Sequence, residues 1–355
     1  MSKFNKFFLR FSLQDQILFA KRLSILVKAG VPVLEALKML KNQSRSRAAS
    51  QILEKVASDV ENGQFLSKSL SQFKRAFGQL ALNIIRIGET GGTLHENLEY
   101  LAQELKKKQA LRRKVIGSLV YPIVIVCATF GISGLLVMYV FPKILPIFAS
   151  LNFKLPWTTR ALIWINSVFL HYGLWIILCL IALVISWMLL LRVRWVRFWI
   201  HRTILTLPLF GSLSQNYQMA NFCRTMGLLL RCDVMIVEAM MIAADTTTNL
   251  VYQKEFYAIG HKITRGEKIS THMHSSNRLF PSMITQMITV GETAGNLSET
   301  LLYLGEMYEN EVDDQTKNLS TTIEPVLMIL MGILVGFIAI SIITPIYGIT
   351  QNLHP

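Results

Sequence analysis

One segment occurs twice in this chain, and the two copies align at a spacing of 203 residues without a gap. The motif Ile87-Gly88-Glu89-Thr90-Gly91-Gly92-Thr93-Leu94 aligns with Val290-Gly291-Glu292-Thr293-Ala294-Gly295-Asn296-Leu297. A repeat of this length is too long for a solenoid unit, so each copy is predicted to be a whole domain with the apolar segment that follows it. The same spacing pairs identical residues from one end of the copies to the other: Val31/Val234, Glu35/Glu238, Gly63/Gly266, Phe77/Phe280, Tyr100/Tyr303, Pro122/Pro325 and Pro142/Pro345.

Three stretches contain no Asp, Glu, Lys or Arg, namely 115–142, 161–191 and 325–351. A helix needs about 20 apolar residues to cross a hydrocarbon core of about 30 Å, and each stretch is longer than that. A buried helix of a soluble protein of this length would carry a polar stripe. We therefore predict three transmembrane helices, 115–142, 161–191 and 325–347.

The distribution of cations predicts the orientation of these helices. Six Lys or Arg residues lie between 106 and 114, before the first stretch, and four between 192 and 202, after the second. The loop 143–160 contains only three. Because cytoplasmic flanks carry the excess of positive charge, domains 1–114 and 192–324 are predicted to be cytoplasmic, and loop 143–160 and tail 348–355 extracytoplasmic. The basic and aromatic start, Met1–Phe11, has no apolar signal-peptide core, so we expect a cytoplasmic N-terminus.

Each repeated domain is predicted to be a bundle of helices, and the fold class all-α. Ser12-x-x-Asp15 resembles a capping box, and the helix that follows should end at Ala29-Gly30. Pro32 suits the first turn of a second helix, and 45–49 is predicted to be a polar loop. Further helices are expected at 52–60, 66–73 and 80–87. Capping boxes at Thr93-x-x-Glu96 and Asn296-x-x-Glu299 should begin the last helices, which we call the stalks, 94–114 and 297–317.

The Gly-Glu motif of each copy has two interpretations. In the first, a glycine-shaped turn displays the acid to a partner protein or a cation. In the second, the glycines supply left-handed backbone at a helix end, and the acid favours the positive N-terminus of the next helix. The candidate partner contacts at the two motifs are Gly88, Glu89, Thr90, Gly91, Gly92, Gly291, Glu292, Thr293 and Gly295.

The two copies carry opposite charge. Residues 15–111 contain 15 Lys or Arg and 9 Asp or Glu, a net charge of +6, whereas 218–314 contain 7 and 12, a net charge of −5. Much of this difference lies on the stalks, whose candidate contact residues are Lys106, Lys107, Lys108, Glu309 and Glu311. Because long-range charge selects partners, we expect the copies to dock different surfaces, or each other head to tail, unless both are merely solvated faces.

No constellation for catalysis, cofactor binding or metal binding is found. Phosphate-loop, dinucleotide, nucleophile-elbow and zinc-protease motifs do not occur. The pair His272-x-His274 corresponds to two serines in the first copy, so a solvated loop is expected. The net charge of +14 lies mostly beside the apolar stretches, so we expect no nucleic-acid partner. Gly332-x-x-x-Gly336 is a candidate site of close helix packing, within the chain or between subunits.

The residue pattern resembles a known family. The pattern Phe280-Pro281-x5-Met287-x3-Gly291-Glu292-x2-Gly295-x-Leu297, its weaker copy from Phe77, and the order domain, span, span, domain, span are similar to the secretion F protein family. This family comprises the inner-membrane platform proteins of type II secretion and type IV pilus systems, including competence pili. Gly78 stands where the second copy has Pro281, so the two motifs differ. The chain begins almost at the first repeat, so we expect it to lack the N-terminal docking segment of longer members.

The resemblance implies a platform without enzymatic activity. Such a platform couples a hexameric cytoplasmic ATPase to the extraction of pilin or pseudopilin subunits from the membrane into a growing filament. It implies ATPase contacts at the Gly-Glu motifs and the stalks, pilin contacts along the spans, further inner-membrane assembly proteins as partners, and self-association. The competing interpretation is a membrane-anchored adaptor or sensor that binds a soluble partner and moves nothing. A transporter is disfavoured because the spans lack charged residues.

Overall fold

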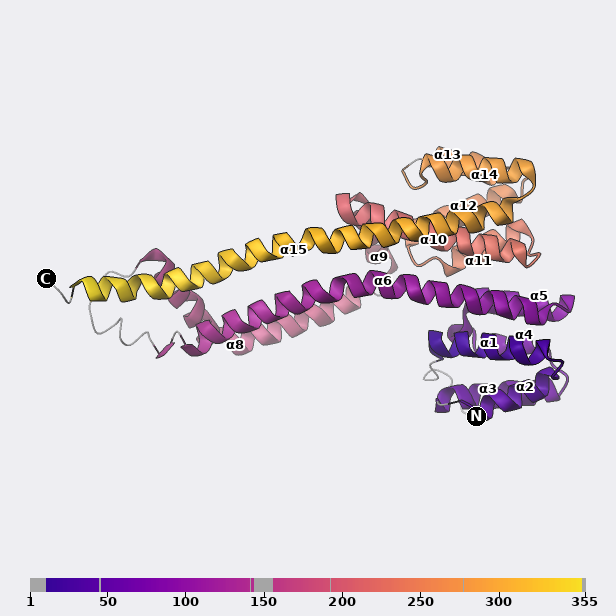
Figure 1. The fold of residues 1–355 in the computed structure, drawn as a ribbon, viewed down its shortest axis with the longest axis horizontal. Coiled ribbons are helices and arrows are strands. Elements are labelled where there is room, and N and C mark those ends of the chain that lie inside the picture. The colour runs from indigo at the N-terminus through magenta and orange to yellow at the C-terminus, as the bar shows by residue number, and fades with distance from the viewer. Residues whose placement is uncertain are drawn as a thin grey trace. The chain divides into compact units, whose positions relative to one another are not determined.

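The structure is a computed structural model that describes residues 11–44, 46–140, 142–143, 156–191, 193–276 and 278–352. Regular structure in these ranges is helical (Figure 1), which confirms the predicted all-α fold for the described residues. The helices form two compact units. The first unit comprises the described residues of Met1–Lys114 and Phe198–Asp314, and the second those of Val115–Arg197 and Gln315–Pro355. Residues 144–155, most of the predicted loop, lie outside the described ranges.

Both copies of the repeat lie in the first unit and consist of the same six helices in the same order. The first copy contains α1 (Leu13–Lys28), α2 (Val33–Asn42), α3 (Arg47–Glu61), α4 (Leu66–Ser71), α5 (Lys74–Gly91) and the start of α6 (Leu94–Leu135). The second contains α10 (Pro208–Arg231), α11 (Ile236–Thr246), α12 (Leu250–Ile263), α13 (Ile269–Ser275), α14 (Ser282–Ala294) and the start of α15 (Leu297–Asn352). The helix α9 (Arg194–Thr206) precedes the second copy.

Local sequence signals account for most helix ends. The capping box of α1 is formed as predicted, because Asp15 N–H donates to Ser12 Oγ (3.1 Å) and Ser12 N–H donates to the Asp15 carboxylate (3.0 Å). Pro32 is the residue before α2 rather than part of its first turn. The predicted loop 45–49 is wrong in part, because α3 already begins at Arg47, where the Ser46 hydroxyl accepts from Ala49 N–H (3.4 Å). Arg45 itself lies outside the described residues.

The fourth and fifth helices differ most from the prediction. The helix α4 ends at Ser71, and α5 continues to Gly91, so Gly88 and Glu89 lie inside a helix and not in a turn. Among the glycines of the two motifs, only Gly92 and Gly295, the residues after α5 and α14, have left-handed backbone, with φ of 75° and 72°. A helix tolerates a glycine such as Gly88 when packing against another helix compensates for the entropy cost of the glycine. Sequence periodicity alone does not reveal such packing.

Each copy has its own aromatic core. In the first copy the ring of Phe77 packs against Phe11 and Phe19, at centroid distances of 4.7 and 5.4 Å. In the second copy Phe256 stacks on Phe222 at 4.2 Å and lies 6.0 Å from Phe280. Because Phe19 and Phe77 are the repeat equivalents of Phe222 and Phe280, the two cores are built around the same positions.

The second unit contains the remainder of α6, α8 (Trp157–Leu190) and the remainder of α15. Its small buried core includes Leu162 of α8 and Ile338 of α15. Thr159 of α8 donates a hydrogen bond to the Ser341 carbonyl (2.8 Å), and the rings of Trp157 and Phe337 lie 6.2 Å apart. These contacts join α8 to α15.

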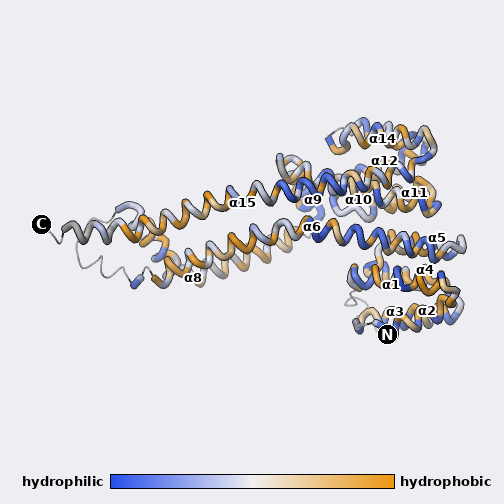
Figure 2. Tube along the Cα trace, viewed as in Figure 1, coloured by the Kyte–Doolittle hydropathy of each residue, from blue (hydrophilic) through white to orange (hydrophobic). Residues whose placement is uncertain are grey.

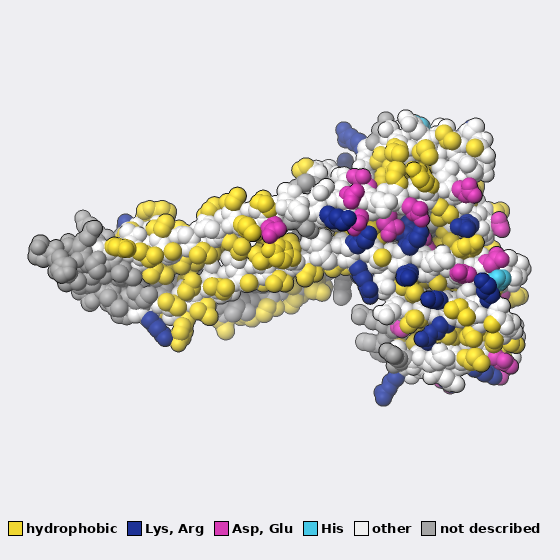
Figure 3. Space-filling model, viewed as in Figure 1, with side chains coloured by type: hydrophobic (Ala, Val, Ile, Leu, Met, Phe, Trp, Pro, Cys, Tyr) yellow, Lys and Arg dark blue, Asp and Glu magenta, His cyan; other side chains and the backbone are white. Residues whose placement is uncertain are grey.

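Apolar side chains cover the surface of the second unit (Figures 2 and 3). Phe130, Leu174, Trp175 and Ile333 are each between 65% and 73% exposed. Two helical segments of the described chain, Leu94–Val140 and Leu297–Thr344, are long and apolar enough to cross a membrane. In α8 the described apolar stretch, Ile181–Leu190, is shorter. Exposed apolar area on this scale marks a surface that another apolar phase covers.

Candidate functional site

The glutamates of the two Gly-Glu motifs bind the N-terminus of a short helix in their own copy. Both oxygens of Glu89 accept hydrogen bonds at the start of α4, one from Leu66 N–H, the other from Ser67 N–H (2.9 Å) and Ser67 Oγ (2.7 Å). In the second copy the carboxylate of Glu292 accepts from Ile269 N–H (2.7 Å), Ser270 N–H (3.1 Å) and Ser270 Oγ (2.6 Å). Each glutamate thus satisfies two free amides of a helix start and lies at its positive end.

This geometry favours the structural interpretation of the motif and corrects its detail. The acid caps the short helix that precedes its own helix in the chain, α4 or α13, and not the stalk that follows. A carboxylate that accepts three hydrogen bonds at a helix start has little capacity left for a cation. Among the described residues no group of three or more His, Cys, Asp or Glu side chains could hold a metal ion.

The first glycine of each motif is a packing residue. A Cβ on Gly88 would lie 3.0 Å from both Leu94 Cα and Asn97 Cβ, and one on Gly291 would lie 2.9 Å from Thr300 Oγ1 and 3.2 Å from Leu297 Cα. These contacts hold α5 close to α6 and α14 close to α15. The remaining members of the motifs, Thr90, Gly91, Gly92, Thr293 and Gly295, are exposed. They are the members of the predicted contact set that a partner protein can reach.

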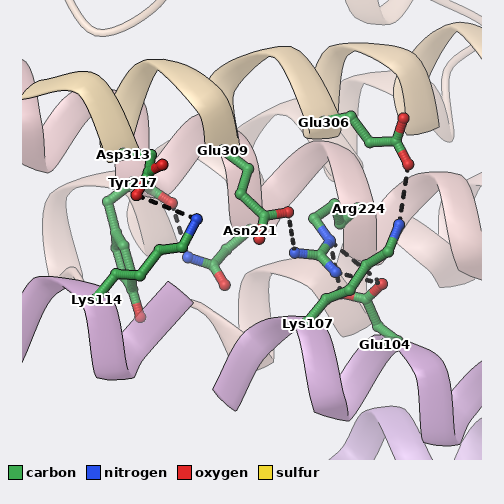
Figure 4. Close-up of polar contacts among 9 residues, drawn as sticks. All are labelled: Glu104, Lys107, Lys114, Tyr217, Asn221, Arg224, Glu306, Glu309 and Asp313. Atoms are coloured by element: carbon green, nitrogen blue, oxygen red, sulfur yellow. Dashed lines mark hydrogen bonds and ion pairs between the residues drawn. The ribbon is translucent and has the colours of Figure 1, made fainter. Parts of the chain in front are cut away.

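Two ion pairs join the stalks. The two stalks lie parallel, and Figure 4 shows the pairs Lys107–Glu306 (2.9 Å) and Lys114–Asp313 (3.1 Å) between them. Within the described chain the two copies therefore contact each other through opposite charges of the stalks. Of the other predicted contact residues, Lys106 and Glu311 are exposed and Lys108 is partly buried among α10 and α11 residues.

A buried arginine connects the two stalks, and the sequence analysis did not find it. Arg224 of α10 is 2% exposed, and its guanidinium donates to Glu104 of the first stalk (3.1–3.3 Å) and to Glu309 of the second (2.9 Å) (Figure 4). Burial raises the pKa of Glu104 above its usual range, and the charge of Arg224 opposes this rise. The signal available in the sequence was a lone charged residue in the largely apolar run Met219–Leu230.

A second pair joins the copies near the first Gly-Glu motif. Arg86 of α5 forms an ion pair with Glu238 of α11. A cleft of about 260 Å³ lies between the copies beside the stalk contact, and Leu228 and Leu302 are among the residues that line it. In this cleft the guanidinium of Arg231 lies 4.4 Å from the ring centre of Tyr100. The first unit is therefore held together by charges of opposite sign on its two copies, as the net charges of +6 and −5 allow.

The remaining candidates have ordinary structural surroundings. His272 is 3% exposed, so it is a core residue and not part of a solvated loop, whereas His274 is exposed. Cys223 and Cys232 are buried, and burial raises the pKa of the Cys232 thiol to about 12. A Cβ on Gly332 or Gly336 would meet no atom within 4 Å, so this pair makes no close contact within the described chain.

Comparison with known proteins agrees with the duplication. A family model described as type II secretion system protein F matches twice, at residues 19–142 and 222–345, with the same spacing of 203. Type IV pilus assembly protein PilC of Thermus thermophilus is 33% identical over 96% of this chain and 84% of its own length. Type II secretion system protein F of Pseudomonas aeruginosa is 31% identical over the same shares, and that of Aeromonas hydrophila 30% identical over 97% and 88%.

Proposed function

Because the chain belongs to the type II secretion system protein F family, we propose that it is an inner-membrane platform protein of a type IV pilus or type II secretion machine. In this role it couples a cytoplasmic assembly ATPase to the extraction and polymerisation of pilin-like subunits, and catalyses no reaction itself. The observation that carries the proposal is the continuity of α6 and α15, each of which begins in a repeat of the first unit and ends in the apolar second unit. A continuous helix can transmit displacement along its axis.

Three spans and two cytoplasmic copies are part of the proposal. The helix α8 has 34 residues, which corresponds to about 51 Å at about 1.5 Å per residue and is enough to cross the membrane. With α6 and α15 this gives domains 1–114 and 192–324 in the cytoplasm, spans at 115–142, 161–191 and 325–347, and the loop 143–160 and C-terminus outside. The cation distribution supports this orientation.

Labelling from the two sides of the membrane tests the topology. Single cysteines at Gln51 and Lys254, which are equivalent exposed positions on the first and second copies, should react with an impermeant maleimide only in inverted vesicles. A cysteine at Ser150 should react only in intact cells stripped of the outer membrane. Reaction of Gln51→Cys and Lys254→Cys from opposite sides would contradict the proposed arrangement.

The ATPase contacts are proposed at the exposed members of the Gly-Glu motifs and at exposed stalk charges. Thr90, Gly91 and Gly92 end α5, and Thr293 and Gly295 occupy the same places at α14. Lys106 extends from the first stalk. A bulky Gly91→Gln change should reduce binding of the ATPase and leave folding intact, because a Cβ there meets nothing closer than 3.6 Å. Gly332 and Gly336 are proposed contacts with another chain in the membrane, since no neighbouring element of the described residues lies within 4 Å of a Cβ at either position.

Deletion of the gene tests the function itself. We expect loss of surface filaments and of DNA uptake or protein secretion, with the pilin-like subunits retained in the inner membrane. Restoration by the wild-type chain excludes effects on neighbouring genes. The alternative, an adaptor or sensor scaffold with no part in motion, predicts filaments of normal length and number and only altered regulation. Intact filaments and normal transport in the deletion strain would reject the platform role.

A further inference from the structure

The two copies contact each other with different faces. The first copy contributes α5 and α6, through Arg86, Glu104 and Lys107. The second copy contributes α10, α11 and a different face of its stalk on α15, through Arg224, Glu238 and Glu306. Lys108 of the first stalk lines a groove of the second copy between α10 and α11, which includes Tyr217 and Thr225, and the space left in it is about 30 Å³. Such a contact between unlike faces is heterologous, and in a duplicated chain it leaves one face of each kind without a partner.

The equivalent faces are exposed in the described chain. On the first copy Ile25 of α1 is 55% exposed, whereas its equivalent Leu228 on α10 is 4% exposed. On the second copy Met283 of α14 is 48% exposed, whereas its equivalent Leu80 on α5 is 7% exposed. Each copy thus repeats the positions of the contact at a place where the described residues of this chain supply no second surface.

An open groove marks the unpartnered face of the first copy. It has a volume of about 420 Å³, and Phe11 and Phe19 form part of its wall. Seven of its residues are the repeat equivalents of residues around Lys108 in the second copy. These are Gln14, Asp15, Leu18, Arg22, Leu40, Gln43 and Ser44, which correspond to Tyr217, Gln218, Asn221, Thr225, Ala243, Thr246 and Thr247.

We propose that this groove receives the second stalk of another copy of the same chain, with the Glu311 side chain in the place that Lys108 takes within one chain. Glu311 is the repeat equivalent of Lys108 and is exposed, and Arg22 in the groove replaces the neutral Thr225. Within one chain Lys108 lies beside the neutral Thr225, whereas the proposed contact places Glu311 beside Arg22, so opposite charges meet only in the proposed contact.

The proposed contact between molecules has the same form as the contact between the copies of one chain. Because each molecule carries both surfaces, the contact can be repeated from one molecule to the next. A heterologous contact of this kind generates a closed ring if the rotation closes and an open row of molecules if it does not. The inference depends on the repeat and on the first unit, and does not depend on the proposed coupling to an ATPase. The net charges of +6 on the first copy and −5 on the second favour this pairing over like-with-like contacts.

Disulfide crosslinking between two tagged forms of the full chain in native membranes tests the proposal. One form carries Arg22→Cys and the other Glu311→Cys, so a product that contains both tags joins two molecules. We expect this mixed dimer on mild oxidation, and no dimer of either form expressed alone. A chain with both Thr225→Cys and Lys108→Cys should crosslink internally and provides the positive control. Lys68→Cys on α4, which does not line the groove, replaces Arg22→Cys as the matched negative control.

Charge reversal distinguishes a specific contact from random encounters. Arg22→Glu in both tagged forms should lower native association of the full chains at least several-fold, measured as co-purification of the two tags, and Glu311→Arg added to both forms should restore it. Absence of the mixed disulfide dimer while the internal control forms would overturn the proposal. Two other results would also overturn it. One is a disulfide dimer between two Arg22→Cys chains. The other is an internal crosslink from Arg22→Cys to a cysteine at Phe8, which would assign the groove to the chain's own first ten residues.

Discussion

At the residue scale, the roles of Glu89 and Glu292 follow from their hydrogen bonds. Each carboxylate accepts three bonds at a helix start, so its removal leaves backbone amides without a partner. We predict that Glu89→Gln and Glu292→Gln each lower the stability of the full chain by about 1–3 kcal/mol, because the amide group replaces one acceptor oxygen by a donor. Thermal unfolding in detergent measures this. The exposed Glu99→Gln should change the midpoint little, and an equal shift for all three variants would contradict the capping role.

Asp233 occupies a left-handed backbone position that suits glycine. Its φ is 58°, and its equivalent in the first copy is Gly30 with φ 82°. A non-glycine residue in this region carries a strain of about 1 kcal/mol or more, partly offset because glycine is more flexible in the unfolded chain. We predict that Asp233→Gly stabilises the protein by up to about 1 kcal/mol and that Gly30→Asp destabilises it. Unfolding midpoints that move in the opposite directions would show that the strain is absent.

The surroundings of His272 lead us to predict that the folded chain loses stability in mild acid. Burial, with the nearby charge of Lys262, lowers the pKa of His272, although Nε2 lies 2.9 Å from the Glu267 carboxylate. The unfolded chain, with a histidine pKa of about 6.5, therefore binds the proton more readily than the folded one. The stability that the neutral His272 gives to the folded chain is complete above pH 6.5 and declines as the pH falls towards the pKa of His272 in the folded state. We predict that His272→Gln removes this part of the pH dependence of the unfolding midpoint, whereas the exposed His274→Gln retains it.

At the element scale, the spacing between α5 and α6 depends on Gly88. A Cβ at this position would lie 3.0 Å from the backbone of Leu94, which cannot yield as a flexible side chain does. We predict that Gly88→Ala, and in the second copy Gly291→Ala, destabilise the chain by about 1–3 kcal/mol through overpacking. Gly91→Ala is the matched control, because its nearest atom is the Thr93 hydroxyl at 3.6 Å. Unfolding in detergent is the measurement, and a loss at Gly91 as large as that at Gly88 would refute the packing argument.

At the scale of the whole molecule, Arg224 holds the two copies in contact. Without its guanidinium, Glu104 and Glu309 would remain buried without their shared cation. We predict that Arg224→Ala destabilises the first unit by about 3–5 kcal/mol and separates the stalks. Disulfide formation between Lys107→Cys and Glu306→Cys in the same chain reports the separation. The control Lys38→Ala removes the exposed pair Lys38–Glu61 and should cost less than about 1 kcal/mol. If the disulfide forms as slowly in Lys38→Ala as in Arg224→Ala, Arg224 has no specific role.

The extent of what the sequence could predict differs between these scales. Helix starts such as Ser12 to Asp15 are local, since the capping residues lie within one turn of each other, and they were predicted correctly. The continuation of α5 through Gly88 to Gly91 was missed, because the contact that compensates for a glycine comes from the next helix. Arg224 was missed because its two partners are 120 and 85 residues away in the chain.

The sequence by itself determined the duplication, the helical fold and the apolar stretches, since each depends on residue order and periodicity alone. It also determined that the copies carry opposite charge. The tertiary structure decided what that charge does: it places Lys107 beside Glu306 and Lys114 beside Asp313, so that part of the difference is used inside one chain. It also decided that the contact is made by unlike faces. Two identical folds present the same faces, and only their placement in space selects which face is covered and which remains open.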